Sequence, residues 1–187
     1  MPKDKSSDSL STSQYTTNDS SSPREKEEKI FMEVECPLTL ISNMSSIFFR
    51  IILQNKQSKL SPKDSTGASL SSKTIPNLTI EEFLVRVAKY SKIEQSTMIS
   101  MFIYIMRVIK NGIVLGYSNV YRIILGACVL SVKFNEDSKF PYFYYAKIGG
   151  LSLQELSKVE YEMYTKLNFS LFITEDEFNE NFDLLLQ

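Results

Sequence analysis

A glycine pair followed at once by a helix-start motif constrains this chain more than any other feature of its sequence. Gly149-Gly150 is typical of a helix end, because glycine adopts helix-terminating backbone conformations at little steric cost. Ser152-x-x-Glu155 comes directly afterwards and has the pattern of a capping box, in which both side chains satisfy free amide groups at a helix start. One helix therefore ends and another begins across a very short turn, which predicts closely connected helices.

The same kind of signal recurs along the chain and predicts an all-α fold. Thr79-x-x-Glu82 and Thr174-x-x-Glu177 are two more capping boxes, and Ser118 is a candidate cap for another helix. Apolar residues recur at helical spacing behind these starts, whereas no alternating strand pattern of useful length appears. The pattern predicts helices over residues 38–55, from Thr79 past Tyr90, and over 95–110, 118–134, 141–148, 152–166 and 175–186.

Composition divides the chain into four parts. Residues 1–37 are polar and charged and are expected to be disordered, because they offer little to bury. Residues 38–57 form a flanking helix, and residues 58–73 are expected to be a polar linker loop. Residues 74–187 form the compact domain with its C-terminal helix. The segment 118–134 is apolar almost all round, which predicts that it is the central, buried helix.

Several function classes are disfavoured by what the sequence lacks. It contains no histidine, which removes the commonest general base and most zinc sites, and its two cysteines are far apart. We therefore expect no catalytic residues, no cofactor and no metal site. The net charge of −1 favours neither nucleic-acid nor membrane binding. Without an apolar N-terminal leader, the expected location is intracellular, in the cytoplasm, the nucleus or both.

The end of the predicted central helix and the aromatic helix after it form the candidate contact surface. Residues 133–137 mix basic and acidic groups, which fits either a partner contact or an ordinary solvated helix end. Residues 140–145 contain five aromatic side chains, which cannot all face inward on one helix. Exposed tyrosines are typical of interfaces. The predicted contact residues are Lys133, Phe134, Glu136, Tyr142, Tyr145 and Lys147.

From Leu38 onward the sequence resembles the P-type cyclins, the family of the yeast phosphate-signalling cyclins and the plant U-type cyclins. The resemblance rests on the order and spacing of several motifs, which are 83–90 (FLVRVAKY), 104–107 (YIMR), 119–122 (NVYR), 132–134 (VKF), 145–152 (YAKIGGLS) and 167–169 (LNF). It implies a single cyclin box of five helices around a buried third helix, with one flanking helix at each end.

The resemblance also implies a function. A cyclin binds a cyclin-dependent protein kinase through the third to fifth helices of its box and holds the kinase αC helix in the active position. The chemistry would belong to the kinase, so the chain itself is not expected to be an enzyme. The alternatives are a cyclin-fold scaffold or transcription-factor-like protein without a kinase partner, and a helical enzyme.

One departure from the family pattern concerns Arg86. The resemblance implies an ion pair between this arginine and an aspartate at the position of Met106. Because methionine cannot accept that bond, Arg86 is expected to reach another carboxylate, backbone carbonyl groups or solvent. Arg86 and Met106 are therefore structural candidates, and replacing Met106 with aspartate would stabilise the fold if the two side chains were within reach.

Overall fold

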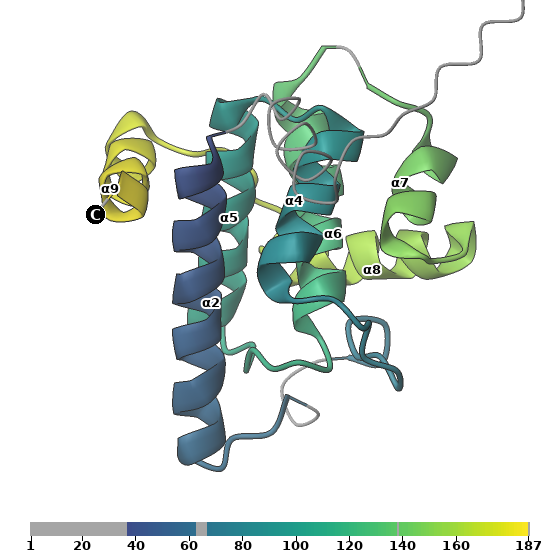
Figure 1. The fold of residues 1–187 in the computed structure, drawn as a ribbon. Helices are drawn as coiled ribbons and strands as arrows, with labels where there is room; N and C mark the ends of the chain where they lie inside the picture. The colour runs from purple at the N-terminus through teal and green to yellow at the C-terminus, as the bar shows by residue number, and fades with distance from the viewer. Residues whose placement is uncertain (1–36, 63–66, 138, 187) are drawn as a thin grey trace, which may run out of the picture.

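The computed structural model describes residues 37–62, 67–137 and 139–186, so the expected disorder of 1–37 falls almost entirely outside the described residues. Within the described residues the chain folds into seven α-helices and no strand, which confirms the predicted all-α class (Figure 1). The helices are α2 (Leu38–Gln57), α4 (Ile80–Ser91), α5 (Gln95–Lys110), α6 (Val120–Asn135), α7 (Tyr142–Gly149), α8 (Leu153–Lys166) and α9 (Glu175–Leu186).

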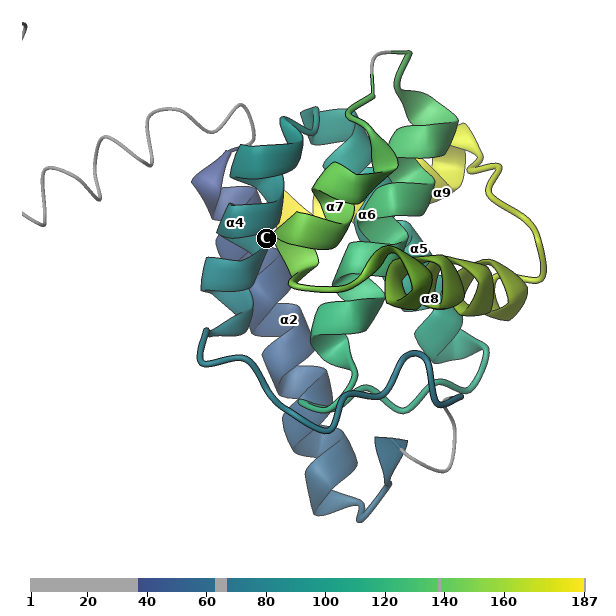
Figure 2. The same ribbon diagram turned by 90° about the vertical axis from the view of Figure 1, so that its right-hand side faces the viewer.

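Helix α6 is the buried centre of the fold. Every residue from 123 to 132 is buried, and the helix packs against α4, α5, α7 and α8. Figure 2 shows α8 crossing α6 with α7 above the crossing. A helix that is apolar all round can be covered by neighbours on every side, because no polar side chain has to be removed from water at a cost in free energy. The prediction of a buried third helix inside a five-helix unit, α4 to α8, is confirmed.

One helix flanks this unit at each end of the chain. Helix α2 packs along α4, and α9 packs against both α2 and α5 (Figure 1). The Phe48 ring of α2 stacks on Phe102 of α5 at 5.7 Å between centroids. The Asn43 side chain donates a hydrogen bond to the carbonyl oxygen of the buried Leu185 at 2.8 Å. The first and last helices are thus joined to each other as well as to the box.

Two of the predicted capping boxes form in both directions. The Glu82 amide donates to the Thr79 hydroxyl oxygen at 3.1 Å, and the Thr79 amide donates to the Glu82 carboxylate at 2.6 Å. Ser152 and Glu155 make the same pair of bonds at the start of α8. These bonds lower the pKa of each glutamate, because an amide donor favours the ionised carboxylate.

The expected cap at Ser118 is wrong by one residue. Helix α6 starts after Asn119, whose side chain does not cap the helix. Instead, the Asn119 side-chain oxygen accepts the Gly116 amide at 2.8 Å, and its amide group donates to the Val114 carbonyl oxygen at 2.9 Å. The buried asparagine therefore closes the turn that leads into α6, a role that depends on the fold of the preceding loop.

The second half of the expected linker is a loop packed on the box. Leu70 is fully buried. Arg122 donates to the Ser69 carbonyl oxygen at 2.8 Å, and the Ser72 amide donates to the Ser118 carbonyl oxygen at 2.7 Å. The residues from 67 to 73 therefore connect α2 to α4 along a defined path over α6 and α8.

Close contact between α6 and α8 depends on Gly126, because a Cβ atom there would lie 2.7 Å from the Met163 side chain. Gly126→Val is expected to lower the free energy of unfolding by about 2 kcal/mol, because the added carbons force the two helices apart. Urea unfolding measures this loss. The control Gln154→Val adds valine at an exposed position of α8 and should cost much less. Equal costs for the two variants would contradict the packing argument.

Candidate functional site

Lys133 lies where α6, α7 and α8 meet. It is in the last turn of α6, its ammonium group bonds Glu160 of α8 at 2.5 Å, and the same group lies 4.6 Å from the Tyr142 ring of α7. The side chain is 46% exposed, so the ion pair itself adds little stability. The ion pair with Glu160 and the contact with the Tyr142 ring instead hold the Lys133 ammonium group at a defined place on the surface.

The predicted contact residues do not all lie at the surface. Lys133, Phe134 and Lys147 are exposed, and Tyr142 is partly buried against Lys133. Tyr145 is only 4% exposed, and burial raises the pKa of its hydroxyl to about 12. Tyr145 therefore does not form part of the exposed surface, and its role as a kinase contact stays a prediction. Its side of α7 packs into the five-helix unit.

Glu136 is partly exposed and has a structural contact. Its carboxylate accepts the backbone amide of Glu94 at 3.2 Å, just before α5 begins. This bond ties the end of α6 to the start of α5. Glu136 therefore helps to shape the candidate surface and lies at its edge.

Three exposed aromatic residues, on α8 and on the segment after it, were not predicted as contacts. Tyr161 of α8 is 68% exposed, and Phe169 and Phe172, which follow α8, are 56% and 69% exposed. Phe172 and Phe134 line the same hollow of about 520 Å³. The sequence carried a signal for Phe169, in the motif at 167–169, but it could not show that these rings point to solvent. We call Lys133, Phe134, Glu160, Tyr161, Phe169 and Phe172 the contact face.

The segment that carries Phe172 is held by Arg107 of α5. The guanidinium donates to the carbonyl oxygens of Ser170, at 3.3 Å, and Phe172, at 2.8 Å. It also pairs with both carboxylate oxygens of Glu177, and this bond raises the pKa of Arg107. Nearby, the Tyr104 hydroxyl donates to the Leu171 carbonyl oxygen at 2.7 Å. Side chains of α5 thus satisfy the backbone of 170–172 and leave the Phe172 ring exposed.

The pairing with Arg107 also changes how α9 starts. The Glu177 amide donates to the Thr174 hydroxyl oxygen at 3.3 Å, as the capping motif predicts. The Glu177 carboxylate, which a capping box would turn back toward Thr174, instead pairs with Arg107. One motif therefore serves both as a helix start and as an anchor between α5 and α9.

Arg86 has one of the partners expected for it. Its Nε donates to the Ile148 carbonyl oxygen at 2.8 Å, at the end of α7, and its guanidinium lies 5.7 Å from the Tyr90 ring. Met106 lines a different hollow, of about 570 Å³, together with Glu177 and Glu180. The two structural candidates thus belong to different parts of the surface.

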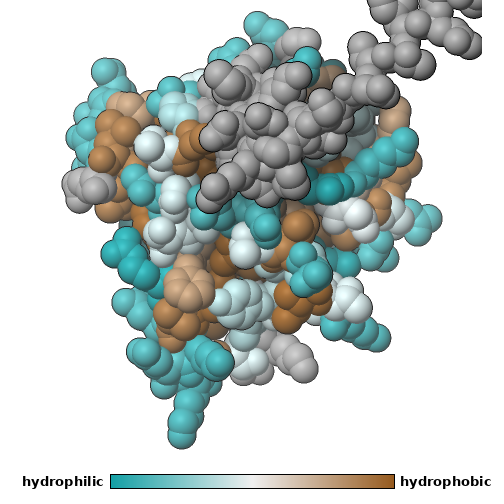
Figure 3. Space-filling model, viewed as in Figure 1, coloured by the Kyte–Doolittle hydropathy of each residue, from teal (hydrophilic) through white to brown (hydrophobic). Residues whose placement is uncertain are grey.

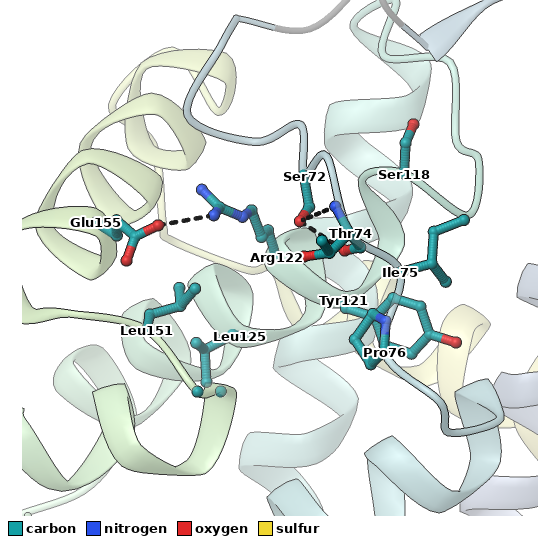
Figure 4. Close-up of a pocket in the computed structure, with 12 residues that line it drawn as sticks. Ser72, Thr74, Ile75, Pro76, Ser118, Tyr121, Arg122, Leu125, Leu151 and Glu155 are labelled. Carbon is teal, nitrogen blue, oxygen red and sulfur yellow. Dashed lines mark hydrogen bonds and ion pairs between the residues drawn. The ribbon is translucent and has the colours of Figure 1, made fainter.

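A separate cavity of about 240 Å³ lies between the loop 72–76, α6 and the turn before α8 (Figure 4). Figure 4 shows the Arg122 guanidinium directed toward Glu155, which it bonds at 3.0 Å. Because Arg122 also donates to the Ser69 carbonyl oxygen, its charge and donors serve the fold. Serine, threonine and tyrosine side chains also line the cavity, together with apolar residues, and no histidine is present to activate a hydroxyl.

Exposed apolar groups alone do not single out a binding site. Figure 3 shows hydrophobic side chains interrupting a hydrophilic surface on the face that contains α2. Apolar atoms make up much of the surface of any folded protein, so side chains held in a fixed arrangement are better evidence of a binding site than exposed apolar groups alone.

In the part of the chain that the structure describes, no cluster of side chains could hold a metal ion. No helix in the same part has the length and apolar character to cross a membrane.

The sequence pattern of the family described as Cyclin matches residues 6–171 of this chain. The chain belongs to the cyclin family. Similar proteins include Cyclin-U2-2 from Arabidopsis thaliana, which is 28% identical over 72% of this chain and 61% of its own length. Cyclin-U3-1 from the same organism is 32% identical over 76% of this chain and 66% of its own length. The PHO85 cyclin-like protein psl1 from Schizosaccharomyces pombe is 28% identical over 71% of this chain and 57% of its own length.

These similarities place the chain among the P-type and U-type cyclins, as its motifs predicted. The chain spans about 60% of the length of Cyclin-U2-2 and of psl1. Helices α4 to α8 are the five helices of the cyclin box. The contact face lies on the third and fifth of these helices and on the segment after the fifth.

Removing the Arg107 anchor is expected to destabilise the fold. In Arg107→Met, Glu177 and two backbone carbonyl oxygens lose a charged donor, which should lower the free energy of unfolding by about 2 kcal/mol. Urea unfolding tests this, with Arg50→Met on the exposed side of α2 as the control. If the two variants unfold at the same urea concentration, water replaces the lost donors and Arg107 is not an anchor.

Met106→Asp is expected to destabilise the protein. Met106 is partly buried and packs against the hydrophobic core, and a charged aspartate would lose these apolar contacts. The new carboxylate cannot use Arg86, which bonds Ile148. The cations Arg107 and Lys110 line the same hollow as Glu177 and Glu180, and Arg107 is already paired with Glu177. Thermal unfolding at neutral pH measures the change. A higher melting temperature would mean that the new carboxylate finds a cation, as it would in the family pattern.

Proposed function

We propose that this cyclin binds a cyclin-dependent protein kinase through the contact face and activates it. The observation that carries the proposal is a pair of exposed aromatic rings at one hollow, at the end of the central helix where Glu160 fixes a cation. Phe134 and Phe172 line one hollow, and Lys133 beside them is held by Glu160. Aromatic anchors surrounded by polar groups are typical of the residues that dominate binding energy at protein interfaces.

The proposed mechanism is stabilisation of the active kinase conformation. The contact face would bind the kinase more tightly when its αC helix is turned inward, where the αC glutamate pairs with the ATP-orienting lysine. Differential affinity for one conformation is sufficient to shift the population toward it. The cyclin would therefore contribute binding energy, and the kinase would supply the catalytic residues.

The first test asks whether a kinase binds at all. The full chain, tagged and expressed in cells, should co-purify with a cyclin-dependent kinase. PHO85, which appears in the name of the relative psl1, is the first protein to test directly. The purified kinase should phosphorylate a peptide substrate faster when the cyclin is added, and the cyclin alone should show no turnover. If no such kinase binds, the alternative of a cyclin-fold scaffold without a kinase partner is favoured.

The second test asks whether the contact face is the binding surface. Phe134→Ala combined with Phe172→Ala should keep the melting temperature, because both rings are exposed. Binding to the kinase should weaken by about 2 kcal/mol or more, which is the usual cost of truncating a central anchor.

The matched control for this test is Phe49→Ala combined with Tyr117→Ala. These two aromatic side chains are 46% and 38% exposed and lie together at a different hollow, between α2 and the segment before α4. The control should bind and activate the kinase as the unchanged protein does. Equal losses in the two double variants, or no loss in either, would show that the contact face is assigned wrongly.

A further inference from the structure

A hollow of about 740 Å³ lies between α2 and the segment that leads into α4. Large apolar side chains that line it are between 38% and 56% exposed, and they are Phe49, Ile75, Leu78 and Tyr117. They come from α2, from the segment before α4 and from the turn before α6. Apolar side chains gathered from separate parts of the chain and left open to solvent are typical of an interaction surface. We call this hollow, with Glu81 and Glu82 on its wall, the acidic hollow.

The walls of the acidic hollow are held in place by the fold. The Tyr121 hydroxyl donates to the Leu78 carbonyl oxygen at 2.5 Å, and the Tyr121 ring meets the Phe83 ring edge to face, at 5.2 Å between centroids. The capping box of Thr79 and Glu82 holds the next residue of the same segment. A partner therefore meets a surface that is already ordered, so less binding free energy is lost in ordering it.

The backbone beside this hollow can also bind a partner. None of the described residues makes a hydrogen bond to the backbone groups of Ile75, Pro76 or Asn77, and all three residues are exposed. An extended segment of another protein can pair with such groups, as it does at the open edge of a sheet. The hollow therefore offers hydrogen bonds together with apolar contact.

The charge at the hollow is negative. Glu81 and Glu82 line it, and none of the described residues that line it is a lysine or an arginine. The bonds with Thr79 lower the pKa of Glu82, which therefore stays ionised at neutral pH. The residues three and four positions before and after Glu81 include no lysine or arginine that could neutralise it. A partner that fits the hollow must therefore bring cations.

This charge decides between the possible occupants. A nucleic acid or an anionic membrane would place phosphate groups against the two carboxylates. The chain's own residues 24–36, which precede α2, contain five glutamates against three cations and would also bring like charge. A short segment of another protein with apolar and basic side chains meets both requirements of the hollow.

We propose that the acidic hollow binds a short basic and apolar segment of a partner protein. Apolar side chains of that segment would pack on Phe49, Leu78 and Tyr117, and its backbone would pair with residues 75–77. A lysine or arginine of the segment would lie beside Glu81. The proposal does not rest on kinase binding, because the residues of the acidic hollow and those of the contact face are different.

The test measures binding of the full chain to a short fluorescent peptide in which leucine and phenylalanine alternate with serine, with lysine at each end. The peptide should bind, and Phe49→Ala combined with Tyr117→Ala should reduce its affinity about tenfold. Phe134→Ala combined with Phe172→Ala changes the contact face and should leave peptide affinity as it was. Kinase binding should show the opposite pattern, so failure of this proposal and failure of the proposed function are distinguishable.

Reversal of one charge tests the basic part of the segment. Glu81→Lys should reduce affinity for the lysine peptide about fivefold, because an attractive exposed charge pair becomes repulsive. Asp176→Lys also replaces an exposed carboxylate in the first turn of a helix and should not change affinity. A peptide with glutamate at each end should bind the Glu81→Lys variant better than the unchanged protein, a gain that a folding loss could not produce.

Three results would overturn the proposal. The first is that the lysine peptide fails to bind the full chain, or that the two aromatic double variants lose affinity equally. The second is that the glutamate peptide binds the unchanged protein as tightly as the lysine peptide does. The third is a dimer of the full chain, measured by sedimentation, that Phe49→Ala combined with Tyr117→Ala dissociates, because a second copy would then occupy the hollow.

Discussion

Complete burial of α6 is the constraint on which the rest of this structure depends. Residues 123–132 expose no side to solvent, so four other helices must cover them, and Gly126 allows α8 to approach closely enough to do so. The helix becomes exposed only after Val132, at Lys133 and Phe134. The most exposed residues of the central helix therefore lie at its C-terminal end, and the contact face begins there.

Polar side chains of α5 determine the other half of that surface. The chain after α8 has backbone carbonyl groups that need partners, and Arg107 and Tyr104 supply them from a helix that is otherwise largely buried. Once the backbone of 170–172 is held in this way, the ring of Phe172 remains at the surface. One partly buried arginine thus links the packing of α9 to the position of an exposed aromatic residue.

Local sequence signals predicted the helices closely and the side-chain directions poorly. Capping boxes and apolar spacing depend on neighbours within about one helical turn, so they indicated the starts of α4 and α8 correctly. The cap at Ser118 failed because Asn119 bonds backbone groups of the loop before it. The aromatic run at 140–145 could not show which rings the neighbouring helices cover, and Tyr145 is one of the covered rings.

By itself the sequence determined the all-α class, the order of the helices and the buried character of the central one, because periodicity and capping are properties of short segments. It also named Lys133 and Phe134 as candidate contact residues, and the structure shows that both are exposed. Only the tertiary structure decided that Glu160 holds Lys133, that Phe172 lies beside Phe134, and that Arg86 bonds Ile148. Those contacts join residues from different helices, and their geometry follows from helix packing rather than from local sequence.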